Sequence, residues 1–233
     1  MELDLNREIL SALEYAYAGK KDIKLHNVHK GVPVSYPATI QGFGGQSIVL
    51  QVNKFQLVCL TLDKYTFIQS ELLPSIVKAS LEDLDFHKTQ VTLHNFAYTV
   101  DTIGKRAFIR VQPQEPIQVV LNNNVRKIQG RLVDISESGL GVVVVEQSPF
   151  SLGLLSRGAS VLVTFRLPGE ATDTLLAGTV RNAAREMDIN SYRIGILVSP
   201  SRQAHETMLR FIARRKTRIL AELDLLYTQL SQA

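Results

Sequence analysis

Residues 128–145 read Ile-Gln-Gly-Arg-Leu-Val-Asp-Ile-Ser-Glu-Ser-Gly-Leu-Gly-Val-Val-Val-Val, and this stretch decides the fold of the C-terminal half. Two runs rich in β-branched and apolar residues flank a short polar segment that begins at Asp134 and ends at Gly139. Aspartate and serine side chains bond nearby backbone in turns, and glycine tolerates turn conformations that other residues avoid. The pattern predicts two strands joined by a turn.

Similar runs extend this β series in both directions. One precedes it and ends at the asparagines Asn122 to Asn124, and three follow it. The runs are Ile117-Gln-Val-Val-Leu, Val161-Leu-Val-Thr-Phe, Leu175-Leu-Ala-Gly-Thr-Val and Tyr192-Arg-Ile-Gly-Ile-Leu-Val. Six strands separated by turn signals predict a closed or nearly closed barrel, because closure removes exposed strand edges.

The N-terminal part predicts a helix followed by a second small antiparallel β-domain. Residues 3–18 carry Leu3, Ile9, Leu10, Leu13 and Tyr17 at helical spacing, which indicates an amphipathic helix that covers a barrel mouth. Residues 21–100 then contain short β-rich runs. We interpret Ile48-Val-Leu-Gln-Val, Leu57-Val-Cys-Leu-Thr-Leu and Gln90-Val-Thr-Leu as strands, and Gly42-Phe-Gly-Gly45 as a hairpin turn.

After Pro200 the pattern changes to one long helix. Arg215 and Lys216 interrupt its apolar stripe, which consists of Met208, Ile212, Ile219, Leu223, Leu226 and Leu230. Packing on the barrel is therefore favoured, with a coiled-coil homodimer as the alternative. The fold class is therefore mainly β, with two small antiparallel barrels, an N-terminal helix and a long C-terminal helix. The expected domains are residues 1–100 (β-domain with its leading helix), 101–115 (linker), 116–200 (second barrel) and 201–233 (C-terminal helix).

Composition limits the function classes. The chain has 233 residues, 45% of them hydrophobic, and a net charge of +4, which suits an anionic ligand but is far from the charge of a dedicated DNA-binding protein. Its one cysteine, Cys59, lies in an apolar run and is expected in the core. The acidic N-terminal residues do not resemble a secretory signal, and no apolar run is long enough to span a bilayer, so a cytoplasmic location is expected.

Two short motifs carry the binding chemistry. Arg106 and Arg110 lie in the segment between the two β series, and Asp134, Ser136 and Gly139 lie on the turn described above. An arginine fork can meet guanine O6 and N7 or a phosphate, whereas a carboxylate can accept from guanine N–H groups. Together these residues predict a site for a guanine nucleotide.

Residues 105–199 resemble a PilZ domain, a bacterial receptor module for cyclic di-GMP. The resemblance rests on Lys105-Arg-Ala-Phe-Ile-Arg-Val, Gly130-Arg-Leu-Val-Asp-Ile-Ser-Glu-Ser-Gly, Gly178-Thr-Val-Arg and Tyr192-Arg-Ile-Gly. It implies a six-stranded barrel that binds cyclic di-GMP through Arg106, Arg110, Asp134, Ser136 and Gly139. Lys105 stands where many members have another arginine, which leaves open whether one ligand molecule or a stacked pair binds.

The residues from 21 to 100 resemble, more loosely, the β-barrel that precedes PilZ in flagellar brake proteins. This implies a receptor whose ligand binds at the interdomain joint and changes the domain arrangement. The receptor would thereby control an unidentified protein partner in motility, biofilm formation or exopolysaccharide production. The alternative is a PilZ-fold adaptor that binds no nucleotide and acts through protein contacts alone.

Other interpretations have weaker support. His26 and His29 lack further nearby ligands for a metal. The basic residues from Arg210 to Arg218 suggest a solvated helix face rather than a nucleic-acid site. The N-terminal β-domain is loosely similar to flavin-binding split barrels, but residues 21–100 contain no phosphate-binding signature. We find no recognisable catalytic motif, so no enzyme activity, metal or cofactor is expected.

Overall fold

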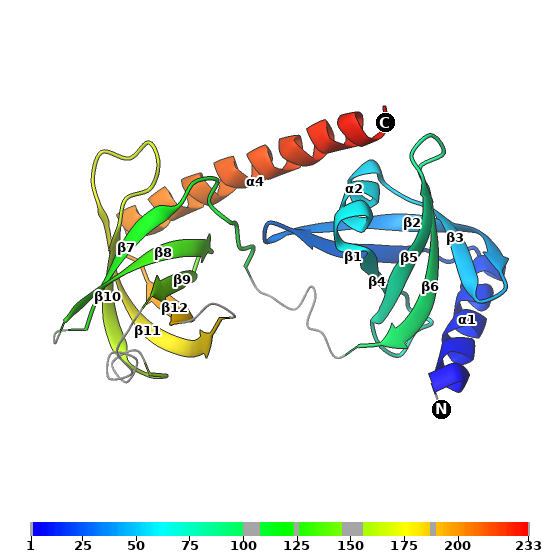
Figure 1. Cartoon of the computed structure of the whole chain (residues 1–233), viewed down its shortest axis with the longest axis horizontal. Helices are drawn as coiled ribbons and strands as arrows, with labels where there is room; N and C mark the ends of the chain where they lie inside the picture. Colours follow the sequence, from blue (N-terminus) through cyan, green and yellow to red (C-terminus); the bar gives the residue numbers. More distant parts are fainter. Residues whose placement is uncertain (1, 100–107, 124–125, 146–155, 187–189, 233) are drawn as a thin grey trace. The chain divides into compact units, whose positions relative to one another are not determined.

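The computed structural model describes residues 2–99, 108–123, 126–145, 156–186 and 190–232. The chain divides into two compact units: residues 1–107 with 219–233, and residues 108–218. Each unit contains one closed barrel of six antiparallel strands. The elements of both units are labelled in Figure 1. The predicted fold class, with two barrels, an N-terminal helix and a long C-terminal helix, is therefore confirmed.

The first barrel has the strand order β1-β2-β3-β6-β5-β4. Alternate residues of β1 and of β3 are buried, as expected of strands with one face toward a core. The elements of this unit are α1 (Glu2–Ala18), β1 (Ile23–His29), β2 (Val32–Gly44), β3 (Ser47–Gln51), α2 (Lys54–Asp63), β4 (Tyr65–Gln69), β5 (Val77–Asp85) and β6 (Gln90–Tyr98). The hairpin turn predicted at residues 42–45 lies where β2 ends and β3 begins.

Helix α1 packs against the first barrel. Its residues Ile9 and Leu13 are fully buried and belong to the same apolar cluster as Leu25, Ile48 and Leu93 of the strands. Fully burying one such side chain contributes about 1.5–3 kcal/mol. The amphipathic character predicted for this helix is confirmed, although Tyr17, assigned to its apolar stripe, is 49% exposed.

The strand predicted at residues 57–62 is wrong, because these residues form helix α2. Asn53 caps the helix start by accepting from the backbone N–H of Phe55 at 2.9 Å, and Lys64 ends it with φ 64°. Leu57 and Leu60 pack into the barrel cluster, whereas Val58 and Cys59 pack into a second cluster with Leu223. A helix buried on two sides shows no polar face, so its short apolar run resembles a buried strand.

The second barrel has the strand order β10-β11-β12-β9-β8-β7. All six strands predicted for this half are observed: β7 (Ile117–Asn122), β8 (Lys127–Ile135), β9 (Gly139–Val145), β10 (Ser160–Phe165), β11 (Thr174–Arg185) and β12 (Ser191–Ser199). The inward residues Leu140, Val142 and Val144 of β9 are 0–2% exposed, while Val145 is 70% exposed. Successive side chains of a strand point to opposite faces, so Leu140, Val142 and Val144 share the inner face, whereas Val143, which is 9% exposed, and Val145 share the outer face. The outer face carries the candidate site.

Helix α4 (Arg202–Leu230) begins close to the predicted position after Pro200 and is 29 residues long. Met208, Ile212, Ile219 and Leu223 of its predicted apolar stripe are buried. Arg215, expected on a solvated basic face, is instead only 4% exposed, because its Nε donates to the carbonyl of Gln112 at 2.7 Å. Among the described residues, no helix combines the length and the apolar character that crossing a membrane requires.

Candidate functional site

A β-bulge in β8 positions Asp134. Leu132 pairs with Val142 and Asp134 with Gly141, so Val133 is an extra residue in the β8 strand. One inserted residue shifts the alternation of side chains and re-aims the residue that follows. Asp134 therefore lies beside Gly141, which has the same parity in β9 as the exposed Val145 and so belongs to the outer face.

Gly141 lets the Asp134 carboxylate lie directly against the neighbouring strand. A Cβ added at Gly141 would lie 2.5 Å from Asp134 Oδ2 and 2.9 Å from Oδ1. Real Cβ atoms essentially never approach so closely, so any other residue at 141 would force the carboxylate away. The glycine is needed here for the space it leaves.

Two arginines surround the carboxylate. Arg193 on β12 donates from Nη2 to Asp134 Oδ2 at 2.5 Å, and Arg110 Nη1 lies 3.7 Å from Oδ1. At 3.7 Å Arg110 and Asp134 form an ion pair but no hydrogen bond. The Asp134 side chain is 8% exposed, whereas those of Arg193 and Arg110 are 49% and 44% exposed. Oδ1 is buried yet accepts no hydrogen bond from any residue that the structure describes.

Backbone pairing brings Arg110 to this place. Val111 forms an isolated bridge with Ile135, with N–H to carbonyl distances of 2.9 Å and 3.0 Å in the two directions. In this antiparallel bridge Arg110 lies across from Ser136, and its Nη1 lies 3.7 Å from Asp134 Oδ1. The segment is also held at Gln112, whose carbonyl accepts from the buried Arg215.

Ser136 and Gly139 close the turn between β8 and β9. The backbone N–H of Ser136 donates to the Gly139 carbonyl at 2.8 Å, and the Ser136 hydroxyl donates to the same oxygen at 3.1 Å. A Cβ at Gly139 would lie 3.3 Å from the Ser136 hydroxyl and from the Ile196 carbonyl, which is tight. The turn is tied to neighbouring segments because Val198 N–H donates to the Ser138 carbonyl at 2.9 Å.

The structure thus brings Arg110 and Asp134 together, with Ser136 and Gly139 on the adjoining turn. Lys105 and Arg106 lie outside the described residues. Sequence reasoning missed Arg193, although Tyr192-Arg-Ile-Gly195 was part of the resemblance. The available signal was strand parity, because Arg193 alternates with the buried Ile194 and so faces outward on β12.

A hollow of about 500 Å³ opens on the same outer face. The hollow lies next to Asp134 and its two arginines, because one of its lining residues, Val143, pairs with Arg193 on one side and with Arg131 on the other. Its volume is within the range of small-molecule sites. The residues that line it are Gln118, Gln129, Gly130, Arg131, Val143, Val145 and Ser191.

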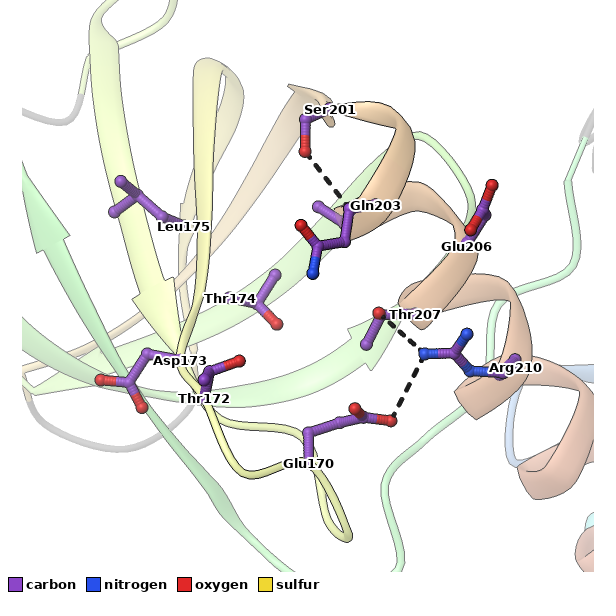
Figure 2. Close-up of a pocket in the computed structure, with 11 residues that line it drawn as sticks. Glu170, Thr172, Asp173, Thr174, Leu175, Ser201, Gln203, Glu206, Thr207 and Arg210 are labelled. Carbon is purple, nitrogen blue, oxygen red and sulfur yellow. Dashed lines mark hydrogen bonds and ion pairs between the residues drawn. The ribbon is translucent and has the colours of Figure 1, made fainter.

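Another cavity of about 500 Å³ lies between the β10–β11 connection and the start of α4, away from the predicted residues (Figure 2). Figure 2 shows the side chain of Arg210 directed toward Thr207 and Glu170. Arg210 Nη2 lies 3.1 Å from the Thr207 hydroxyl and 3.9 Å from Glu170 Oε1. Asp173 and Glu206 are likewise paired, with Arg166 and Arg202. Each charged group that lines this cavity is therefore paired with a neighbouring side chain.

The histidine pair does not form a metal site. His26 and His29 are three residues apart on β1, so their side chains point to opposite faces. The ring of His26 is hydrogen-bonded to Ser35 at 2.7 Å and to Gln69 at 2.8 Å, and burial lowers its pKa. Within the described part of the chain, no group of three or more His, Cys, Asp or Glu residues is placed to hold a metal ion.

Comparisons with known proteins identify similar chains. Residues 104–214 match the family model described as PilZ domain. An uncharacterized protein of Aquifex aeolicus (strain VF5) is 27% identical over 165 residues, covering 70% of this chain and 74% of that protein.

Three solved structures are similar at low identity. The Bacillus subtilis inhibitor of motility MotI/DgrA is 15% identical, with 84% of this chain and 96% of that chain covered and a TM-score of 0.45. YcgR of Escherichia coli in complex with c-di-GMP is 12% identical, with coverage of 94% and 93% and a TM-score of 0.45. The K. pneumonia MrkH–c-di-GMP complex is 13% identical, with coverage of 91% and 96% and a TM-score of 0.43.

Proposed function

We propose that this chain, of which residues 104–214 match the PilZ domain model, is a receptor for cyclic di-GMP that binds on the outer face of the second barrel. One observation carries the proposal: Oδ1 of Asp134 is buried beside two arginines and accepts no hydrogen bond from the described residues. A buried carboxylate oxygen without a donor is costly unless a partner arrives. A ligand with N–H groups supplies that partner.

Guanine fits this arrangement chemically. Its N1–H and N2–H groups donate side by side, and a carboxylate is the side chain that accepts from both. Because Arg193 is already hydrogen-bonded to Asp134 Oδ2, Oδ1 is the oxygen that accepts from the guanine N–H groups. Adenine presents an acceptor at N1 and would place it against the same negative oxygen, so the site favours guanine over adenine.

Arg110 supplies the positive charge for the rest of the ligand. At 3.7 Å from Oδ1 and 44% exposed, its guanidinium is only loosely held and can turn toward guanine O6 and N7 or toward a phosphate oxygen. We propose that Arg106 and Lys105 add further contacts to phosphate. Ser136 and Gly139 keep the turn closed, so that the ligand approaches the backbone beside Asp134.

The turn between β8 and β9 also contacts helix α4. Glu137, in the turn, is hydrogen-bonded through Oε1 to Nε2 of His205, in the first part of α4, at 3.0 Å. A ligand that reshapes the turn would therefore act on α4. We propose that binding changes the domain arrangement and thereby controls a protein partner in motility, biofilm formation or exopolysaccharide production.

Calorimetric titration tests the binding proposal. The wild-type chain is titrated with cyclic di-GMP, GMP and cyclic di-AMP, and we expect cyclic di-GMP to bind with the highest affinity. Arg110→Ala should weaken this binding about tenfold or more, because a charge-assisted contact is lost. Arg166→Ala is the matched control, since it also removes an exposed arginine from an aspartate partner, Asp173. Equal affinity of Arg110→Ala and wild type would contradict the site assignment.

Small-angle scattering tests the rearrangement separately. A ligand shifts a conformational equilibrium only if it binds one arrangement better than another. We expect the scattering profile to change on saturation with cyclic di-GMP. An unchanged profile would contradict the rearrangement and leave the binding proposal standing.

A further inference from the structure

Four residues on four neighbouring strands form one row across the outer face of the second barrel. Asp134 of β8 pairs with Gly141 of β9, Gly141 pairs with Gly195 of β12, and Gly195 pairs with Asn182 of β11. Two glycines therefore stand in the middle of the row, with a carboxylate at one end and a carboxamide at the other.

Both polar residues reach the row by the same structural device. Val133 is the extra residue before Asp134, and Arg181 is the extra residue before Asn182, since Val180 pairs with Ile196 and Asn182 with Gly195. Each bulge re-aims the residue that follows it. Only the first of these bulges belongs to a motif that the sequence assigned to ligand binding.

The Asn182 side chain lies on Gly195 as Asp134 lies on Gly141. A Cβ built at Gly195 would lie 1.9 Å from Asn182 Oδ1, and its three nearest atoms all belong to Asn182. Directly opposed residues of an antiparallel pair have side-chain positions about 5 Å apart. The carboxylate and the carboxamide thus lie over adjacent positions, close enough to meet one planar base.

We propose that Asn182 is a second base-recognition residue, which reads the guanine of cyclic di-GMP together with Asp134; this rests on the proposed function. A carboxamide carries two N–H donors beside its oxygen. With guanine N1–H and N2–H donating to Asp134 Oδ1, the adjacent O6 needs a donor, which the Asn182 amide supplies. The orphaned Oδ1 of the 95% buried Asp134 is the independent sign that this row accepts a ligand.

The alternative role for Asn182 is to fill the space that Gly195 leaves. A space-filling residue would affect the melting temperature, whereas a recognition residue affects affinity and the choice between guanine and adenine. The exposed position of Asn182 favours recognition, because its amide lies at the surface where a ligand can reach it. Both readouts are therefore measured for each variant.

Calorimetry with cyclic di-GMP and cyclic di-AMP, alongside thermal unfolding, tests the inference on Asn182→Ala and Asn182→Asp. We expect Asn182→Ala to bind cyclic di-GMP about five- to tenfold more weakly, as the loss of one hydrogen bond implies, and to discriminate less against cyclic di-AMP. Asn182→Asp should lose more affinity for cyclic di-GMP than Asn182→Ala, because it removes the N–H donor and adds a negative charge. Gln203→Ala, which removes an exposed amide from the cavity of Figure 2, should bind like wild type.

Gly195→Ala provides a second test that keeps the asparagine. Its new methyl group would displace the Asn182 side chain, so affinity should fall and the melting temperature should drop. In the double variant with Asn182→Ala the obstacle is gone. We expect the melting temperature to recover and the affinity to equal that of Asn182→Ala alone. Additive losses in the double variant would contradict the proposed geometry.

The outcomes separate the two proposals. If wild type binds cyclic di-GMP and Asn182→Ala binds it equally well, the role of Asn182 is refuted while the proposed function stands. If wild type binds no cyclic di-GMP, the proposed function fails and the role of Asn182 fails with it.

Discussion

Asp134 and Gly141 face each other across the β8–β9 pair, and the carboxylate of Asp134 occupies the space that a side chain at position 141 would need. The carboxylate is thus positioned by a bulge on its own strand and by a missing Cβ on the next. Both are backbone features of a closed barrel, so the barrel itself holds the carboxylate of the candidate site in place. A ligand that binds as proposed would meet a carboxylate that is already positioned.

Replacing Gly141 by alanine should abolish this arrangement. The added Cβ would lie 2.5 Å from Asp134 Oδ2 and would push the carboxylate away from Arg193. We expect the affinity for cyclic di-GMP to fall at least tenfold in calorimetry. Gly42→Ala is the control, because nothing lies within 4 Å of a Cβ at that glycine. Unchanged affinity in Gly141→Ala would show that the position of the carboxylate is unimportant.

Arg193 should act on affinity through Asp134. Arg193→Ala frees Oδ2, so the carboxylate can turn and no longer presents Oδ1 in one direction. We expect about tenfold weaker binding of cyclic di-GMP, and a smaller loss for Arg193→Lys, which keeps the charge without the planar fork. Both variants are titrated with cyclic di-GMP, and Arg166→Ala is titrated in the same way as the control. Affinity equal to wild type in Arg193→Ala would contradict this role of Arg193.

The strands of the second barrel could be predicted from sequence because each is a short β-rich run bounded by turn residues. The turn motif that contains Asp134 could be recognised in the sequence, and the structure brings this residue next to Arg110; its role in binding stays a prediction. The row from Asp134 to Asn182 could not, because bulges at Val133 and Arg181 change which residues face outward. Strand register and bulges depend on the neighbouring strand, which lies elsewhere in the sequence.

Two further errors have the same origin in tertiary contacts. Residues 57–62 were predicted as a strand because a helix buried on two sides lacks the polar face by which helices are recognised. Arg215 was predicted as a solvated charge because its partner is a backbone carbonyl, that of Gln112, which no side-chain pattern can reveal.

Leu223 should stabilise the first unit, to which this part of α4 belongs. It is fully buried in a cluster with Val34, Val58 and Cys59. Leu223→Ala should reduce the free energy of unfolding by about 2–4 kcal/mol, measured by urea denaturation. Leu225→Ala is the matched control, because Leu225 is 60% exposed and should change stability by less than about 0.5 kcal/mol. Equal effects of the two substitutions would contradict this packing of α4.

Cys59 should be unreactive in the folded protein. Burial, with a smaller effect of Asp63, raises the pKa of its thiol to about 12 from the ordinary value of 9.0. We expect iodoacetamide to label the protein at pH 8 in urea but not in its absence, because only the thiolate reacts. Rapid labelling without urea would contradict the burial of this side chain.

The same shift predicts a pH dependence of stability. Above pH 9.0 the unfolded chain loses the Cys59 proton while the folded chain keeps it until about 12. The free energy of unfolding therefore falls as pH rises through this window, by at most about 1.4 kcal/mol per pH unit. Urea denaturation at pH 8 and pH 10 should show a larger fall for wild type than for Cys59→Ala. An equal fall in both would contradict the shift.

A crystal structure of the chain with cyclic di-GMP is the sharpest test of the proposed site. We expect a guanine on the outer face of the second barrel, with its N1–H or N2–H within hydrogen-bond distance of Asp134 Oδ1 and with Arg110 turned toward the ligand. A ligand bound elsewhere, for example in the cavity of Figure 2, with Asp134 Oδ1 contacting no part of it, would refute the proposed site.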